Sequence, residues 1–199
     1  MLYIQNHSDT VILVVHEIYG LNRHMHDFCD VLAEQGFDVM CPNLLERKLA
    51  FDYSCEEEAY RHFMEDVGFT GALDKVKAIL FDIKDVYKRI FVIGFSAVAT
   101  VAWMCSEGES VDGIVGYYGS RIRNYSDLVP QCPVLLFFAQ EERSFDVNEL
   151  ISSLQSKPID IHTFNGKHGF SDSHNSNYDG ESAERAFSIM IDFLRSMMV

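Results

Sequence analysis

One serine stands where an apolar strand would turn into a helix. The stretch Gly94-Phe95-Ser96-Ala97-Val98 lies between two apolar runs and approximates the G-x-S-x-G pattern of a nucleophile elbow. Such an elbow holds a nucleophile above the edge of a sheet, beside a helix N-terminus whose free N–H groups stabilise negative charge. Val98 takes the place of the second glycine. The pattern favours nucleophilic chemistry at Ser96, although a buried strand and helix with an incidental serine would have a similar sequence.

A serine nucleophile needs a base to take its proton and an acid to orient that base. Ser96 is followed by Glu141, Glu142 and Asp146, and then by His168. This is the order serine, acid, histidine that α/β-hydrolases use. Each group comes soon after a predicted strand, which makes a chance arrangement less probable. At this point any of the three acids could be the partner of the histidine.

The rival histidines are His16, His162 and His174, and they give weaker signals. His162 lies inside a predicted strand, and His174 shares the loop of His168 but lacks its glycine-flanked setting. The eight histidines include no H-E-x-x-H pattern and no paired Cys/His spacing, so we expect no metal site.

Strands and helices alternate along the whole sequence. Apolar runs predict strands at residues 11–15, 37–41, 90–93, 111–118, 133–138 and 159–164. Helical spacing predicts helices at 24–35, 57–66, 71–88, 147–154 and 181–197, with a further helix after the elbow as far as Cys105. The pattern is typical of one α/β domain over residues 1–199, with a mostly parallel central sheet and helices on both faces. Ligands of such sheets bind at the carboxyl ends of the strands, where the candidate residues are expected to lie.

Composition restricts the partners and the compartment. The chain has 30 acidic and 16 basic residues and a formal charge of −14, which argues against nucleic acid and anionic membranes as partners. Its five cysteines are odd in number and include no C-x-x-C pair, which suits a reducing cytoplasm. We see no signal peptide at the N-terminus and no apolar run long enough to span a bilayer. We therefore expect a cytoplasmic protein.

Several motifs together resemble the dienelactone hydrolases, which are small α/β-hydrolases. The resemblance covers nearly the whole chain, from Val11 to Leu194. Its marks are the elbow and the segments His16-Glu17-Ile18-Tyr19-Gly20-Leu21-Asn22, Gly36-Phe37, Cys41-Pro42-Asn43-Leu44, Gly116-Tyr117-Tyr118-Gly119 and His168-Gly169-Phe170, followed by Tyr178 and the closing helix.

The resemblance implies a role for each site residue. Ser96 takes the nucleophile position, which is a cysteine in the dienelactone enzymes, and His168 takes the position of the base. Glu142 stands where the family has an aspartate. The backbone N–H groups of Ile18 and Ala97 would form the oxyanion hole.

Glu17 matches a glutamate that helps control the protonation of the nucleophile in the family. Because a serine does not form a thiolate, this role does not apply directly here, and the role of Glu17 is open. Two arginines that hold a carboxylate in the family are replaced here by Glu56 and Asp172. We therefore expect this pocket to prefer neutral or cationic esters over anionic ones.

These observations predict a hydrolase that cleaves a small-molecule ester, thioester or lactone through an acyl-serine intermediate, without a cofactor. We expect a monomer or homodimer. The alternative is a catalytically decayed protein of the same fold that binds a small molecule, which Val98 and the altered acid would favour. A nucleotide-binding α/β domain is less favoured, because no G-x-G-x-x-G or Walker sequence follows the first predicted strand.

Overall fold

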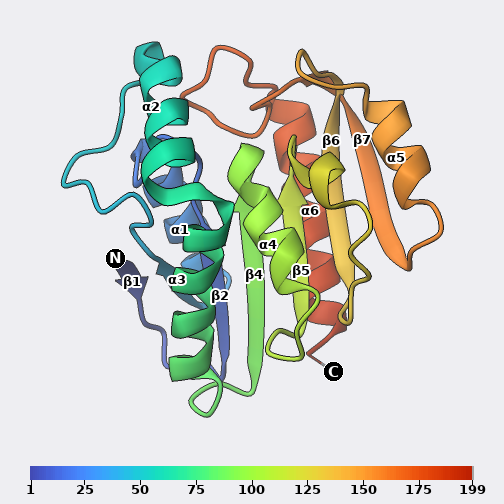
Figure 1. The fold of residues 1–199 in the computed structure, drawn as a ribbon. Coiled ribbons are helices and arrows are strands. Elements are labelled where there is room, and N and C mark those ends of the chain that lie inside the picture. Colours follow the sequence, from blue (N-terminus) through green and yellow to red (C-terminus); the bar gives the residue numbers. More distant parts are fainter. Residues whose placement is uncertain (199) are drawn as a thin grey trace.

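A seven-stranded sheet forms the centre of the molecule in a computed structural model that describes residues 1–198 (Figure 1). The spatial order of the strands is β1-β3-β2-β4-β5-β6-β7. β1 pairs antiparallel with β3, and the other neighbouring strands pair in parallel, which confirms the mostly parallel sheet. The strands are β1 (Leu2–Ile4), β2 (Thr10–Val15), β3 (Asp38–Cys41), β4 (Arg89–Phe95), β5 (Gly113–Tyr117), β6 (Val134–Glu141) and β7 (Ile159–Lys167).

Helices cover both faces of the sheet, as predicted (Figure 1). On one face, α1 (Arg23–Glu34) and α6 (Gly180–Ser196) pack against strand residues such as Ile12 and Val14. The opposite face, which carries Leu13, is covered by α2 (Glu56–His62), α3 (Gly68–Ile83), α4 (Ala99–Cys105) and α5 (Val147–Leu154). All six residues of β2 are buried. This two-sided burial explains the continuous aliphatic run in the sequence, because neither face of the strand meets water.

The structure differs from the predicted elements in several places. β6 and β7 each extend three residues past their predicted ends, to Glu141 and Lys167. β1 was not predicted, because three residues are too few to show a hydrophobic pattern. No loop separates the predicted helices 57–66 and 71–88: α2 leads through a π-helical turn, η2 (Phe63–Val67), directly into α3. α3 ends before the predicted Lys88, because Tyr87 turns inward and its hydroxyl donates to Asp38 Oδ2 at 2.8 Å.

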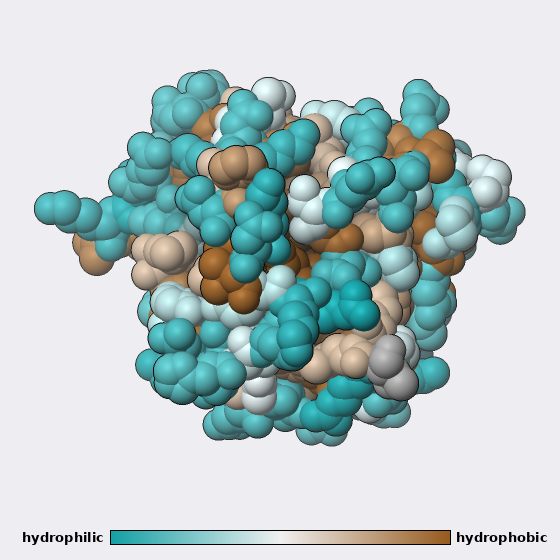
Figure 2. Space-filling model, turned by 90° about the horizontal axis from the view of Figure 1, so that it is seen from below, coloured by the Kyte–Doolittle hydropathy of each residue, from teal (hydrophilic) through white to brown (hydrophobic). Residues whose placement is uncertain are grey.

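The end of the molecule at the amino ends of the parallel strands is mostly hydrophilic (Figure 2). Hydrophobic areas on that face are interrupted by hydrophilic residues. Across residues 1–198, no helix combines the length and the apolar character that crossing a membrane requires.

Candidate active site

Ser96 lies at the sharp turn between β4 and the helix that follows. Its φ of +55° is in the left-handed region, which costs energy for a residue with a side chain and is often found at functional sites. The chain continues through one 3₁₀ turn, η3 (Ser96–Val98), into α4. The turn leaves Ser96 beyond the carboxyl end of β4, as a nucleophile elbow requires.

Gly94 allows α4 to approach the strand closely. A Cβ atom at Gly94 would lie 2.7 Å from the Cα of Ala99 and 3.0 Å from the Cβ of Ala102, which is too close for unshifted backbone. At the second glycine position, the side chain of Val98 is fully buried and is part of the hydrophobic core. The elbow therefore depends on its first glycine, while the second position accommodates valine.

His168 links Ser96 to Glu142 through hydrogen bonds at its two ring nitrogens. Ser96 Oγ lies 2.8 Å from His168 Nε2, and His168 Nδ1 lies 2.8 Å from Glu142 Oε2 and 3.1 Å from Oε1. Because a carboxylate can only accept, Nδ1 carries the ring proton and Nε2 accepts from the serine hydroxyl. The Glu142 side chain is 2% exposed and is thus shielded from competing water.

Strand register explains why the glutamate meets the histidine. The last pair between β6 and β7 is Glu141 with Lys167, and a register shift precedes it: β6 advances two residues from Ala139 while β7 advances three from Phe164. Glu142 and His168 are the first residues after β6 and β7. The bulge therefore aligns the acid and the base at one edge of the sheet.

The other candidates for acid and base are occupied elsewhere. Glu141 is exposed. Asp146 caps α5, where its Oδ1 accepts from the backbone N–H of Asn148 and of Glu149. His174 binds Asp27, with 2.8 Å between Nε2 and Oδ2. The structure thus brings Ser96, His168 and Glu142 together and places the rival acids and the rival base in other contacts.

The charge around His168 favours its protonated form. Burial alone would lower the pKa of His168, but the hydrogen bond and charge of Glu142, with smaller effects of Glu17 and Glu56, raise that pKa above its ordinary value. The imidazole is therefore a stronger base than a free histidine.

His16 anchors the segment that carries Glu17 and Ile18. Its Nδ1 donates to the Glu17 carbonyl at 2.6 Å, and its Nε2 accepts from the backbone N–H of Leu44 at 2.9 Å. Burial lowers the pKa of His16 to about 4, so the ring is neutral and can make both contacts. Ile18 and Ala97, the two residues expected at the oxyanion hole, are both nearly buried and both border the cavity at Ser96.

A cavity of about 1020 Å³ opens in front of Ser96. Its wall contains acidic, basic and aromatic side chains, including Tyr19, Tyr53, Glu56, Tyr60, Arg121, Arg143 and Lys167. The Arg121 guanidinium donates to the Tyr60 hydroxyl. Arg121 and Arg143 therefore reach this wall, although the two positions that hold arginines in the family carry Glu56 and Asp172 here. In the part of the chain that the structure describes, no group of three or more His, Cys, Asp or Glu side chains could hold a metal ion.

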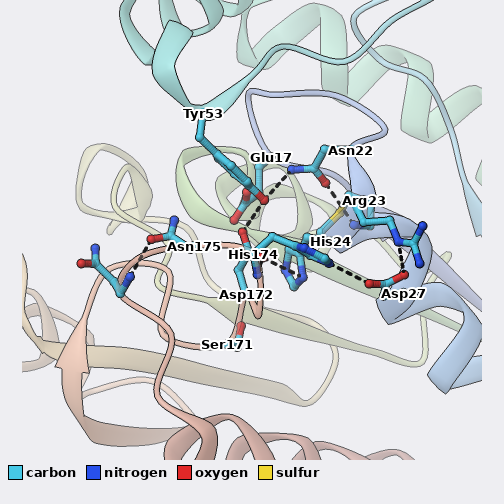
Figure 3. A network of polar contacts seen from close by, with 12 residues as sticks. Glu17, Asn22, Arg23, His24, Asp27, Tyr53, Ser171, Asp172, His174 and Asn175 are labelled. Carbon is cyan, nitrogen blue, oxygen red and sulfur yellow. Dashed lines mark hydrogen bonds and ion pairs between the residues drawn. The ribbon is translucent and has the colours of Figure 1, made fainter.

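Asp172 lies in a buried polar network that the sequence did not reveal (Figure 3). Tyr53 donates from its hydroxyl to Asp172 Oδ2 at 2.5 Å and accepts from Asn22 Nδ2 at 3.1 Å. Asp172 Oδ1 accepts from the backbone N–H of His174 and lies 3.6 Å from His24 Nδ1. Asp172 has no exposed surface, and Tyr53 but not Asp172 lines the cavity. Although Asp172 replaces an arginine that holds a carboxylate in the family, its side chain does not face a ligand directly here.

Sequence comparison finds relatives that match most of the chain. The chain is 39% identical over 163 residues to the protein YczH of Bacillus subtilis (strain 168), covering 80% of each chain. It is 26% identical over 199 residues to a carboxymethylenebutenolidase of Pseudomonas putida, covering 92% of this chain and 84% of that one.

Solved structures share the fold. An esterase of Pyrococcus furiosus, Pf2001, matches with a TM-score of 0.73 and 18% identity over 99% of this chain and 86% of that chain. A dienelactone hydrolase-like promiscuous phosphotriesterase from metagenomic libraries, P91, matches with a TM-score of 0.70 and 16% identity over 94% and 86% of the two chains. The sequence model of the dienelactone hydrolase family matches residues 1–198, and the chain therefore belongs to that family.

Proposed function

We propose that this member of the dienelactone hydrolase family is a serine hydrolase that cleaves a small-molecule ester, thioester or lactone through an acyl-serine intermediate. Family membership and the likeness to esterases support hydrolysis of an ester bond. The observation that carries the serine mechanism is the distance of 2.8 Å between Ser96 Oγ and His168 Nε2, at a turn where Ser96 has φ +55°.

The mechanism assigns one role to each group. Ser96 Oγ attacks the ester carbonyl carbon while His168 Nε2 takes its proton, and His168 then gives that proton to the leaving oxygen. His168 next removes a proton from water, whose oxygen attacks the acyl-serine, and then gives that proton to Ser96 Oγ as the acid is released. Glu142 holds the Nδ1–H and stabilises the imidazolium. The backbone N–H groups of Ile18 and Ala97 bind the oxyanion, and no step needs a cofactor.

Labelling with a fluorophosphonate probe tests this mechanism without knowledge of the substrate. The probe forms a covalent bond to an activated serine, and mass spectrometry locates the bond. We expect labelling on the peptide that contains Ser96, and no labelling of Ser96→Ala, which should also lose short-chain ester hydrolysis by about 10⁶-fold. A folded wild-type protein that takes up no probe would contradict the proposal and support the alternative of a decayed binding protein.

A further inference from the structure

Glu17 lies beside Ser96, just beyond the same edge of the sheet. Val15 of β2 pairs with Gly94 of β4, and Glu17 and Ser96 each lie two residues beyond that pair. Parallel strands stand about 4.8 Å apart, so the two residues leave the sheet as neighbours. Both line the same cavity, although Glu17 is only 4% exposed. The carboxyl group of Glu17 has no role in the mechanism proposed above.

The surroundings of Glu17 do not stabilise a negative charge. Its one side-chain hydrogen bond among the described residues comes from the Tyr118 hydroxyl at 3.5 Å, and that hydroxyl lies closer to Ser171 Oγ, at 3.0 Å. The nearby Tyr53 hydroxyl donates to Asp172 instead (Figure 3). A buried carboxylate without a cation or a short hydrogen bond is costly, so the neutral acid is favoured.

Asp172 adds to this preference. It accepts from Tyr53 and from the backbone N–H of His174, contacts that suit an ionised carboxylate. Burial first, and then the charge of Asp172, raise the pKa of Glu17 to about 7, while His168 and Tyr118 partly oppose them. Of the two buried acids, Glu17 is therefore the one whose protonated form is favoured, and about half of it is protonated near pH 7.

We propose that Glu17 acts in its protonated form, donating a hydrogen bond to an oxygen atom of the ester bound at Ser96. This inference rests on the proposed serine mechanism. The proton stays on Glu17 throughout, so the step is a hydrogen bond and not a transfer. A neutral carboxyl group in an apolar site can serve as such a donor. Asp172 is the positioning residue that keeps the proton on Glu17.

Several titratable groups face Glu17 and must be considered in a pH experiment. They are Asp172, His168, Tyr118, Tyr53 and Tyr19, and Glu56 lies on the same cavity wall. The tyrosines stay protonated over the range tested, because their pKa values lie above 10. His168 gives an acid limb, since it must be deprotonated to act as base. Loss of the Glu17 proton gives a separate alkaline limb.

The test compares Glu17→Gln with Glu17→Ala in the profile of kcat/KM against pH for a neutral aryl ester. Glutamine has nearly the same shape and keeps a donor but cannot lose its proton. We expect Glu17→Gln to stay within about tenfold of wild type at its optimum and to lose the alkaline limb, whereas Glu17→Ala loses about 10²–10³-fold, as for removal of one donor to a developing charge. Glu56→Gln is the matched control: it removes another acid of the cavity wall and should keep the alkaline limb.

Three outcomes would overturn the inference. Equal damage by Glu17→Gln and Glu17→Ala would mean that the ionised form works. Unchanged kcat/KM in Glu17→Ala would mean that Glu17 contributes nothing to the reaction. An alkaline limb that persists in Glu17→Gln would belong to another group. Fluorophosphonate labelling of Ser96 in each variant shows that the protein is folded and the nucleophile intact, which separates failure of this inference from failure of the serine mechanism.

Discussion

Ser96 and His168 are separated by 72 residues of sequence, yet Oγ of one lies 2.8 Å from Nε2 of the other. The contact exists because the serine follows β4 and the histidine follows β7, and all the parallel strands end at the same edge of the sheet. The hydrogen bond points the serine proton at the unprotonated nitrogen of the ring, which is the direction that its removal requires.

Replacement of His168 should abolish activity, and replacement of His174 should not. His174 is hydrogen-bonded to Asp27, so His174→Ala should retain most ester hydrolysis, while His168→Ala leaves Ser96 without a base. In wild type, kcat/KM should rise with pH through the pKa of His168. That midpoint should lie above 6.5, because Glu142 outweighs the effect of burial. Activity that survives in His168→Ala but not in His174→Ala would reverse the assignment.

Glu142→Gln should lower kcat by roughly 10⁴-fold, as loss of the orienting carboxylate does in a serine triad. The amide can offer its N–H side to His168 and so disfavour the productive tautomer. It also removes the negative charge that raises the pKa of His168, so the acid limb of the profile should move to lower pH. Glu141→Gln, at an exposed neighbouring position, is the control. Comparable losses in both variants would show that a general loss of charge is responsible.

Gly94→Ala should destabilise the fold by about 1–3 kcal/mol, because the new methyl group would press on the backbone of Ala99 and overpack the core. Gly71→Ala is a suitable comparison: it lies within α3, with no atom within 4 Å of the added Cβ, and should stabilise the protein by about 0.5–1 kcal/mol. Urea unfolding measures both changes. A Gly94→Ala variant as stable as wild type would mean that α4 can move away without cost.

Arg121→Met should change the response of the enzyme to substrate charge. The guanidinium lines the cavity and is held by Tyr60, so it is placed to bind an anionic group of a substrate. We expect kcat/KM for a carboxylated aryl ester to fall about tenfold or more, as for a lost hydrogen bond to a charged group, while the neutral analogue changes little. Arg143→Met, at an exposed part of the same wall, is the comparison. Equal losses for both esters would show that Arg121 only supports the wall.

The sequence was sufficient for features that depend on local pattern. Three features could be placed at the ends of strands: the turn after the aliphatic run before Gly94, the glycine-flanked His168, and the acids after the run that begins at Pro133. The fold brings these strand ends together. The choice of Glu142 over Glu141 was made by resemblance. Its physical basis is the bulge between β6 and β7, which has no signal in the hydrophobic pattern.

Contacts between loops could not be predicted from the sequence. Tyr53 and Asp172 are 119 residues apart, and neither lies in a periodic segment, so nothing in the sequence indicated their hydrogen bond. The same reason explains why the sequence, which only aligned Asp172 with a carboxylate-binding arginine of the family, did not indicate its burial. Its burial depends on how the loop after β7 folds against the loop before α2, which only three-dimensional packing decides.

The order of the strands also sets when the site can form during synthesis. A ribosome adds about 5–20 residues per second, so the 72 residues between Ser96 and His168 take roughly 4–14 s to make. Throughout that interval the nascent chain holds Ser96 without His168. If the proposed mechanism holds, ester hydrolysis begins only after β7, the last strand of the sheet, has been translated and has paired with β6.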